Sequence, residues 1–202
     1  MSSVSYVLAL KSSQLTVQAF AEGLAGVADH RPRFSFRDFS GDIEFDQDRL
    51  SAGSLHLSAK TRSLDIMDEV SQRDRRAIER VMFDEVLHPE IFPEVVFHSS
   101  LVVCRLLGEN RYCADITGTV SLHGTTHPHS MQAQLVLSSG SLRAYGEFRL
   151  RQTDHGLTIA SVAGGILRIK DELKFGFFIV ARARDPEEPG SRVSYTTSVP
   201  QS

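Results

Sequence analysis

The chain is poor in several residue types that mark other classes of protein. It has no tryptophan and two cysteines among 202 residues, and its formal net charge is −3. Two cysteines cannot build a disulfide scaffold, and a nucleic-acid surface needs an excess of Lys and Arg. No apolar run is long enough for a transmembrane helix, and the first residues lack the basic start of an export signal. We therefore expect a cytoplasmic protein with no transmembrane segment and no nucleic-acid partner.

Catalytic motifs are missing too. The sequence has no Gly-x-Ser-x-Gly elbow and no His-Glu-x-x-His pair. Gly164-Gly165 comes nearest to a phosphate-binding loop, but no Lys-Ser or Lys-Thr follows it. Asp154-His155 is better explained as a turn between strands than as half of a proton relay. We expect no enzymatic activity and no cofactor.

Alternation of apolar and polar residues is the dominant pattern in the chain. From Phe39 to Asp46 the odd positions are apolar or small and the even positions are polar, which is typical of a half-buried strand. Tyr6 to Leu10 and Leu15 to Ala19 predict a first hairpin. About eight such strands with short links predict an all-β antiparallel barrel over residues 1–185. The remaining residues, 186–202, lack apolar periodicity and are expected to be a flexible tail.

One segment has helical rather than strand periodicity. Ser71 is placed as a helix N-cap, and apolar residues follow at helical spacing as far as Leu87, just before His88-Pro89. We expect a helix that lies across one end or side of the barrel, with Met82 and Phe83 facing it.

Six segments carry a resemblance to a known family. They occur in the same order as in the YceI-like, polyisoprenoid-binding barrel proteins, and the similarity extends from Tyr6 to Arg184. The resemblance implies a lipocalin-like barrel around an elongated apolar tunnel that holds an isoprenoid chain or a similar long amphiphile. The segments are Phe39 to Asp46 (FSGDIEFD), Met82 to Asp84 (MFD), Phe92 to Ser99 (FPEVVFHS), Gly118 to Thr126 (GTVSLHGTT), Arg151 to Leu157 (RQTDHGL) and Lys170 to Leu173 (KDEL).

The expected ligand-binding residues are the apolar positions on the inner face of the strands. Burial of each methylene of a ligand stabilises the complex by roughly 0.8 kcal/mol, so such a site needs no catalytic group. Twelve Phe and no Trp provide bulk without indole N–H groups that would need partners. Alternatively, these side chains fill the barrel themselves. The candidates are Phe45, Leu57, Phe97, Leu101, Val120, Leu122, Met131, Leu135, Phe148, Phe175, Phe177 and Ile179.

A polar head on such a ligand would lie at the mouth of the barrel. Basic side chains near strand ends could bind a diphosphate there by charge-assisted hydrogen bonds. The candidates are Arg149, Arg151, Arg168 and Lys170, each of which is also explained as a solvated surface charge.

Two other classes of function stay open. His123, His127 and His129 lie within seven residues and could bind a metal ion, although their turn-like surroundings also account for polar residues. A barrel with a filled interior could instead be an interaction module or a homodimer. The two cysteines, Cys104 and Cys113, would lie opposite each other in a hairpin that turns at Gly108-Glu109, and we expect both to be reduced.

Overall fold

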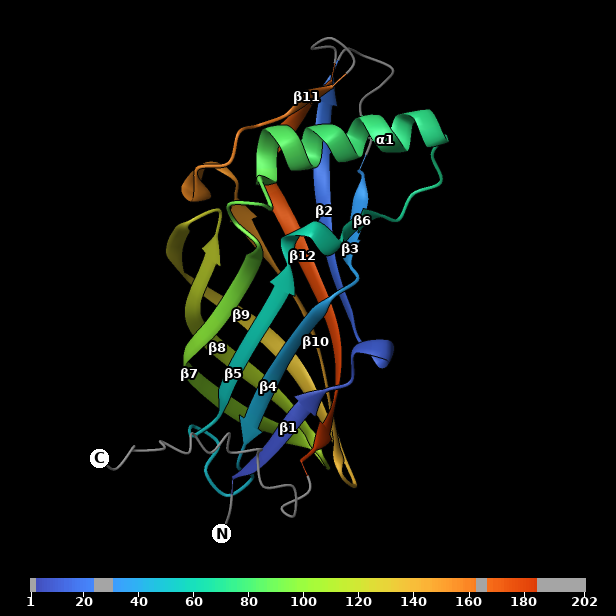
Figure 1. The fold of residues 1–202 in the computed structure, drawn as a ribbon. Helices are drawn as coiled ribbons and strands as arrows, with labels where there is room; N and C mark the ends of the chain where they lie inside the picture. Colours follow the sequence, from blue (N-terminus) through green and yellow to red (C-terminus); the bar gives the residue numbers. More distant parts are fainter. Residues whose placement is uncertain (1–2, 24–30, 163–166, 185–202) are drawn as a thin grey trace, which may run out of the picture.

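The structure is a computed structural model that describes residues 3–23, 31–162 and 167–184. Figure 1 shows strands wrapped around a common axis, with a helix across one end. The strands are β1 (Val4–Leu8), β2 (Gln14–Gly23), β3 (Arg33–Phe36), β4 (Phe39–Phe45), β5 (Ser54–Lys60), β6 (Leu64–Ile66), β7 (Glu94–Gly108), β8 (Arg111–Leu122), β9 (Thr125–Ser138), β10 (Ser141–Arg151), β11 (Ser161–Val162) and β12 (Leu167–Ala183). The helical elements are α1 (Gln72–Arg80), the π-helical η3 (Val81–Leu87) and the short turns η1 (Leu10–Ser12), η2 (Thr61–Ser63) and η4 (Thr153–His155).

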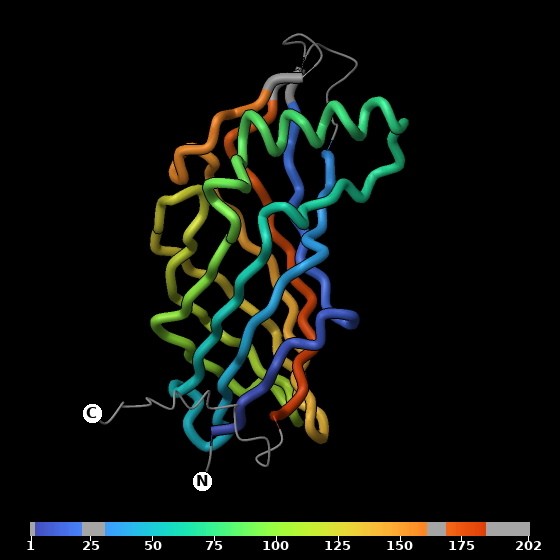
Figure 2. The backbone as a smooth tube through the Cα atoms, in the orientation of Figure 1, coloured from blue at the N-terminus to red at the C-terminus, as the bar shows by residue number. Residues whose placement is uncertain are grey.

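Eight strands close into the barrel in the order β1, β4, β5, β7, β8, β9, β10 and β12, and β1 pairs with β12 to complete the ring. Neighbouring strands are antiparallel. The predicted lipocalin-like barrel of about eight strands is therefore confirmed. Beyond β1, β12 also pairs with β2, which is followed in the sheet by β3 and β6. Figure 2 shows this extension reaching toward the end that the helix covers.

The predicted N-terminal hairpin is wrong. β1 pairs with Ala181–Ala183 of β12, and β2 pairs with the preceding part, Leu167–Phe178. Both strands therefore run in the same direction along β12 and form one interrupted strand. The Ser13 hydroxyl stabilises the interruption, because it donates to the Ala9 carbonyl at 2.9 Å and accepts from the Val180 amide at 2.9 Å. A hairpin would need β1 and β2 to pair with each other, and both instead use β12.

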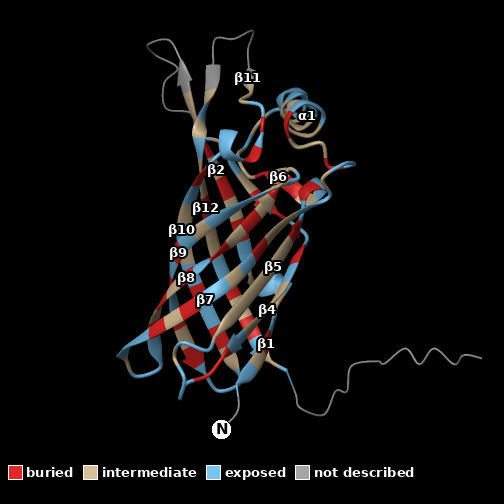
Figure 3. Ribbon diagram, turned by 90° about the vertical axis from the view of Figure 1, so that its left-hand side faces the viewer, coloured by how far each residue is buried: buried red, intermediate tan, exposed pale blue. Residues whose placement is uncertain are grey.

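Alternation along the strands directs one face to the interior, and Figure 3 shows buried residues alternating with more exposed ones. β7 departs from this rule at a β-bulge between Ser99 and Leu101. The extra residue shifts the inward face by one position, so Phe97 and then Val102 face the interior. Leu101 is 51% exposed. The prediction that Leu101 faces the interior is therefore wrong.

The predicted helix is confirmed and continues through η3. Ser71 caps α1, since its hydroxyl accepts from the Asp74 amide at 3.1 Å. Met82 packs toward the barrel as expected, in the lining of an apolar cavity. Phe83 lies instead beneath the guanidinium of Arg62, at 5.4 Å from the ring centroid.

The two cysteines do not face each other. The β7–β8 hairpin turns at Glu109-Asn110, one residue later than predicted, and the register shifts again between Leu106 and Gly108. Cys104 therefore pairs with Ala114 and Cys113 with Arg105. Adjacent register positions point to opposite faces of a sheet. Cys104 is buried in the interior, Cys113 is partly exposed, and both thiols are free.

The predicted tail, residues 186–202, lies outside the described residues. In the part of the chain that the structure describes, every helix is too short or too polar to span a bilayer.

Candidate functional site in the barrel interior

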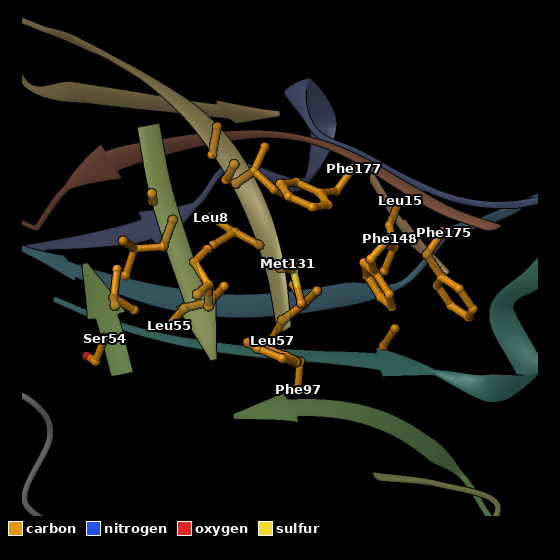
Figure 4. Close-up of a pocket in the computed structure, with 18 of the residues that line it drawn as sticks. Leu8, Leu15, Ser54, Leu55, Leu57, Phe97, Met131, Phe148, Phe175 and Phe177 are labelled. Carbon is orange, nitrogen blue, oxygen red and sulfur yellow. The ribbon is translucent and has the colours of Figure 1, made fainter. Parts of the chain in front are cut away.

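The barrel encloses an apolar cavity. Its volume is about 80 Å³, and all eight barrel strands contribute lining residues. Figure 4 shows these side chains converging from strands on opposite sides of the barrel. Glu44 and Ser54 are the polar residues of the lining. The interior of the described barrel is therefore neither completely filled nor polar.

Ten of the twelve predicted ligand-binding residues line this cavity. Leu122 is buried in the hydrophobic core but does not line the cavity, and Leu101 faces outward for the reason given above. The ten are Phe45, Leu57, Phe97, Val120, Met131, Leu135, Phe148, Phe175, Phe177 and Ile179.

Several lining residues were not among the candidates. The alternation could have found five of them, because each lies on the same strand two residues from a candidate: Ile43, Leu55, Ala59, Val95 and Ala133. Four are alanines, which leave space beside the larger side chains and carry no hydrophobic signal strong enough to stand out. The missed apolar residues are Leu8, Leu15, Phe36, Ile43, Leu55, Ala59, Val95, Val96, Val102, Ala114, Ile116, Ala133 and Ala144.

Phenylalanine rings restrict the cavity. Phe148 stacks on Phe175 with ring centroids 5.0 Å apart and planes at 12°. An apolar cavity of roughly 150 Å³ stays dry and accepts a molecule the size of benzene. The barrel cavity, at about 80 Å³, has a smaller volume than that. A longer chain can enter only if some of these rings turn.

A second apolar cavity lies beneath the helix. Its volume is about 210 Å³, and α1 and η3 cover it with residues such as Met82 and Val86. Val17 on β2 and Leu173 on β12 line it, and each lies two residues from a residue of the barrel cavity, Leu15 and Phe175. The two cavities therefore lie along the same inner face of β2 and β12, although their linings share no described residue.

The three histidines proposed as metal ligands do not converge. His123 approaches His88, with Nε2 and Nδ1 3.2 Å apart. His127 packs against His155, and the ring of His129 packs against Phe148. In residues 3–23, 31–162 and 167–184, no group of three or more His, Cys, Asp or Glu is placed to hold a metal ion. This arrangement does not support the alternative of a metal site at the three residues, because His123 lies in the β8–β9 turn whereas His127 and His129 lie within β9.

Three of the four basic residues proposed for a diphosphate head, Arg149, Arg151 and Lys170, do not line the cavity. Arg149 forms an ion pair with Glu172, and Arg151 forms one with Asp171 at 2.9 Å. Lys170 is exposed, and the side chain of Arg168 lies outside the described part of the chain. Arg149 and Arg151 alternate with the inward-facing Phe148 and Leu150, which explains why they lie on the outer face.

The fold and its interior define a lipocalin-like barrel with an apolar cavity. The profile of the YceI-like domain matches residues 6–181, and the chain belongs to this family. It is 31% identical to a UPF0312 protein of Enterobacter sp. (strain 638) over 102 residues, which are 50% of this chain and 47% of that protein. The chain spans about half the length of the curated relatives it matches.

Solved structures show the same fold at low sequence identity. BcnA of Burkholderia cenocepacia superposes with a TM-score of 0.67 at 17% identity, covering 86% of this chain and 98% of that one. A polyisoprenoid-binding domain from Saccharophagus degradans has a TM-score of 0.62 at 14% identity, covering 90% and 99%. At such identities the likeness concerns the fold alone.

Proposed function

We propose that the barrel binds a long apolar chain of the isoprenoid type in its interior, without catalysis. The observation that carries this proposal is the apolar cavity to which all eight barrel strands contribute. The cavity beneath the helix lies in line with it, so an extended chain could occupy both. The polyisoprenoid-binding domain with the same fold supports this ligand class.

Shape would determine the selectivity of such a site. Each buried methylene contributes roughly 0.8 kcal/mol, and the turning of Phe148 and its neighbours would offset part of this gain. An apolar pocket distinguishes ligands that differ by one methylene by only about 1–3 kcal/mol. We therefore expect chains of similar width to bind with similar affinity.

The absence of reactive groups from the cavity supports binding over chemistry. Of the described lining residues, Glu44 is the only one with an ionisable side chain, and it lies exposed near the end of β4. A general acid or base acts on a group within hydrogen-bond reach, and the remaining lining offers none.

Native mass spectrometry and organic extraction of the purified protein test this proposal. Phe177 and Phe178 form a matched pair on β12, because Phe177 lines the cavity whereas Phe178 points outward and is 43% exposed. We expect the wild type and Phe178→Glu to retain or take up a C20 isoprenoid, and Phe177→Glu to lose it while keeping the strand signal in circular dichroism. Equal uptake by both variants, or no uptake by the wild type, would contradict the proposal.

A further inference from the structure

The barrel wall opens between β9 and β10. Their pairing extends from Ser141 with Ser138 to Glu147 with Gln132, and beyond that point no further register pairs join the described residues of the two strands. A groove lies here, lined by both strands and by part of β8. Ile116, Met131 and Phe148 line the groove and the barrel cavity alike. At this place side chains alone, without a hydrogen-bonded sheet, separate the cavity from the outside.

His129 stands at this opening. It pairs with Gly118 of β8, whose position shares the inner face with Ile116 and Val120, so the imidazole also belongs to the inner face. Its ring centroid lies 4.8 Å from that of Phe148. Gly118 has no side chain beside the imidazole of His129. No larger residue fits at position 118, because a Cβ would lie 2.1 Å from the backbone carbonyl oxygen of His98.

The Nε2 atom of His129 has no hydrogen-bond partner among the described residues, although it is buried. Burial lowers the pKa of His129, which keeps the imidazole neutral near pH 7. A buried polar atom without a partner is costly to the fold and is uncommon. The atom lies at the boundary of an otherwise apolar cavity, where a bound molecule could supply the missing partner.

The charged groups around the groove are already paired. Glu147 forms an ion pair with Lys174 at 2.6 Å, and Arg149 forms one with Glu172. Asp115 accepts from Gln132 at 2.6 Å. An anionic head such as a diphosphate would have to break these pairs, whereas a neutral oxygen would not.

We propose that His129 recognises a neutral oxygen, a hydroxyl or a carbonyl, on the apolar chain bound in the barrel, and that the groove between β9 and β10 admits this end of the ligand. This inference rests on the proposed function, because it assigns one residue of the same site. A chain that displaces Phe148 to enter the narrow cavity also removes the ring packed against His129. The imidazole then hydrogen-bonds the oxygen and fixes the depth at which the chain is held.

The test uses the full chain with three ligands of equal length: geranylgeraniol, the corresponding C20 hydrocarbon and geranylgeranyl diphosphate. The variants are His129→Phe, which removes the nitrogen, His129→Gln, which restores a polar group, and His127→Phe as a control at an exposed position of the same strand. A second readout is the ¹⁵N chemical shift of the His129 ring during titration with each ligand.

We expect His129→Phe to weaken binding of the alcohol roughly 3- to 10-fold, in line with the loss of one hydrogen bond, and to leave the hydrocarbon unchanged. His129→Gln should recover part of the loss, and His127→Phe should match the wild type. Equal losses for alcohol and hydrocarbon, an unmoved ¹⁵N shift, or tightest binding of the diphosphate would overturn the inference while leaving the carrier proposal standing. Failure of the wild type to bind any of the three would overturn both.

Discussion

Substitution of Gly146 by alanine should destabilise the barrel, although the same change is often stabilising elsewhere. Gly146 lies opposite Phe177 of β12 and Ala133 of β9. A Cβ added there would lie 2.4 Å from the Gln132 carbonyl oxygen and 2.7 Å from Cζ of Phe177. Both distances are below any normal contact. The carbonyl belongs to the strand backbone, so it cannot move aside as the tip of a side chain could.

Two effects of opposite sign decide the magnitude. Replacing Gly by Ala stabilises a compatible site by about 0.4–1 kcal/mol, because the unfolded chain loses freedom. Overpacking of an interior site costs about 1–3 kcal/mol. The net expectation is a loss of roughly 1–2 kcal/mol in the free energy of unfolding, or about 2–8 °C in Tm for a chain of this size.

Urea and thermal unfolding of Gly146→Ala and Gly108→Ala provide the measurement. A Cβ on Gly108 meets only the Arg111 guanidinium, at 3.4 Å, which is an ordinary contact. Gly108→Ala should therefore be neutral or slightly stabilising. The double variant Gly146→Ala/Phe177→Leu should recover part of the loss, because it relieves the ring contact but not the carbonyl contact. If Gly146→Ala proves as stable as Gly108→Ala, the close packing of β10 against β9 and β12 is wrong.

Two further predictions concern titratable groups. Burial lowers the pKa values of His123, His129 and His155, so the unfolded state binds protons first as the pH falls. The contribution of these histidines to the free energy of unfolding should therefore be complete above the pKa of about 6.5 that they have in the unfolded chain, and it should decrease as the pH falls below that value. Urea unfolding at about pH 7.5 and about pH 5.5 measures this difference. A higher free energy of unfolding at the acidic pH would contradict the prediction. Burial raises the pKa of Cys104 to about 11, whereas Cys113 is partly exposed. Iodoacetamide should thus modify Cys113 in the native protein and reach Cys104 only on unfolding, as peptide mass mapping would show.

Alternation along the sequence predicted which faces of most strands turn inward. Phe39 to Phe45 on β4, Met131 to Leu137 on β9 and Leu173 to Ile179 on β12 have the predicted faces, because each segment forms an uninterrupted strand. The prediction for Leu101 is wrong because of the bulge between Ser99 and Leu101. One extra residue exchanges the inward and outward positions that follow it, and nothing in the sequence at Ser100 indicates a bulge.

Long-range arrangement was harder to predict. The segment Lys11-Ser12-Ser13 looks like a hairpin turn in the sequence, but β12 is long enough to pair with the strands on both sides of it. The cavity beneath the helix arises from contacts between η3 and the extended ends of β2 and β12, which no local pattern encodes. The sequence indicates His129 only as a possible metal ligand, because its inward direction follows from its pairing with Gly118 on a neighbouring strand.

The most direct test of the central claim is NMR of the protein labelled with ¹³C at its methionine methyl groups, titrated with geranylgeraniol. Met131 lines the barrel cavity, Met82 lines the cavity beneath the helix, and Met67 lines neither. A chain held in the interior predicts nuclear Overhauser effects from the ligand to the Met131 methyl, extending to Met82 if both cavities are filled, and none to Met67. A ligand that perturbs Met67 but leaves the Met131 methyl unchanged would contradict binding inside the barrel.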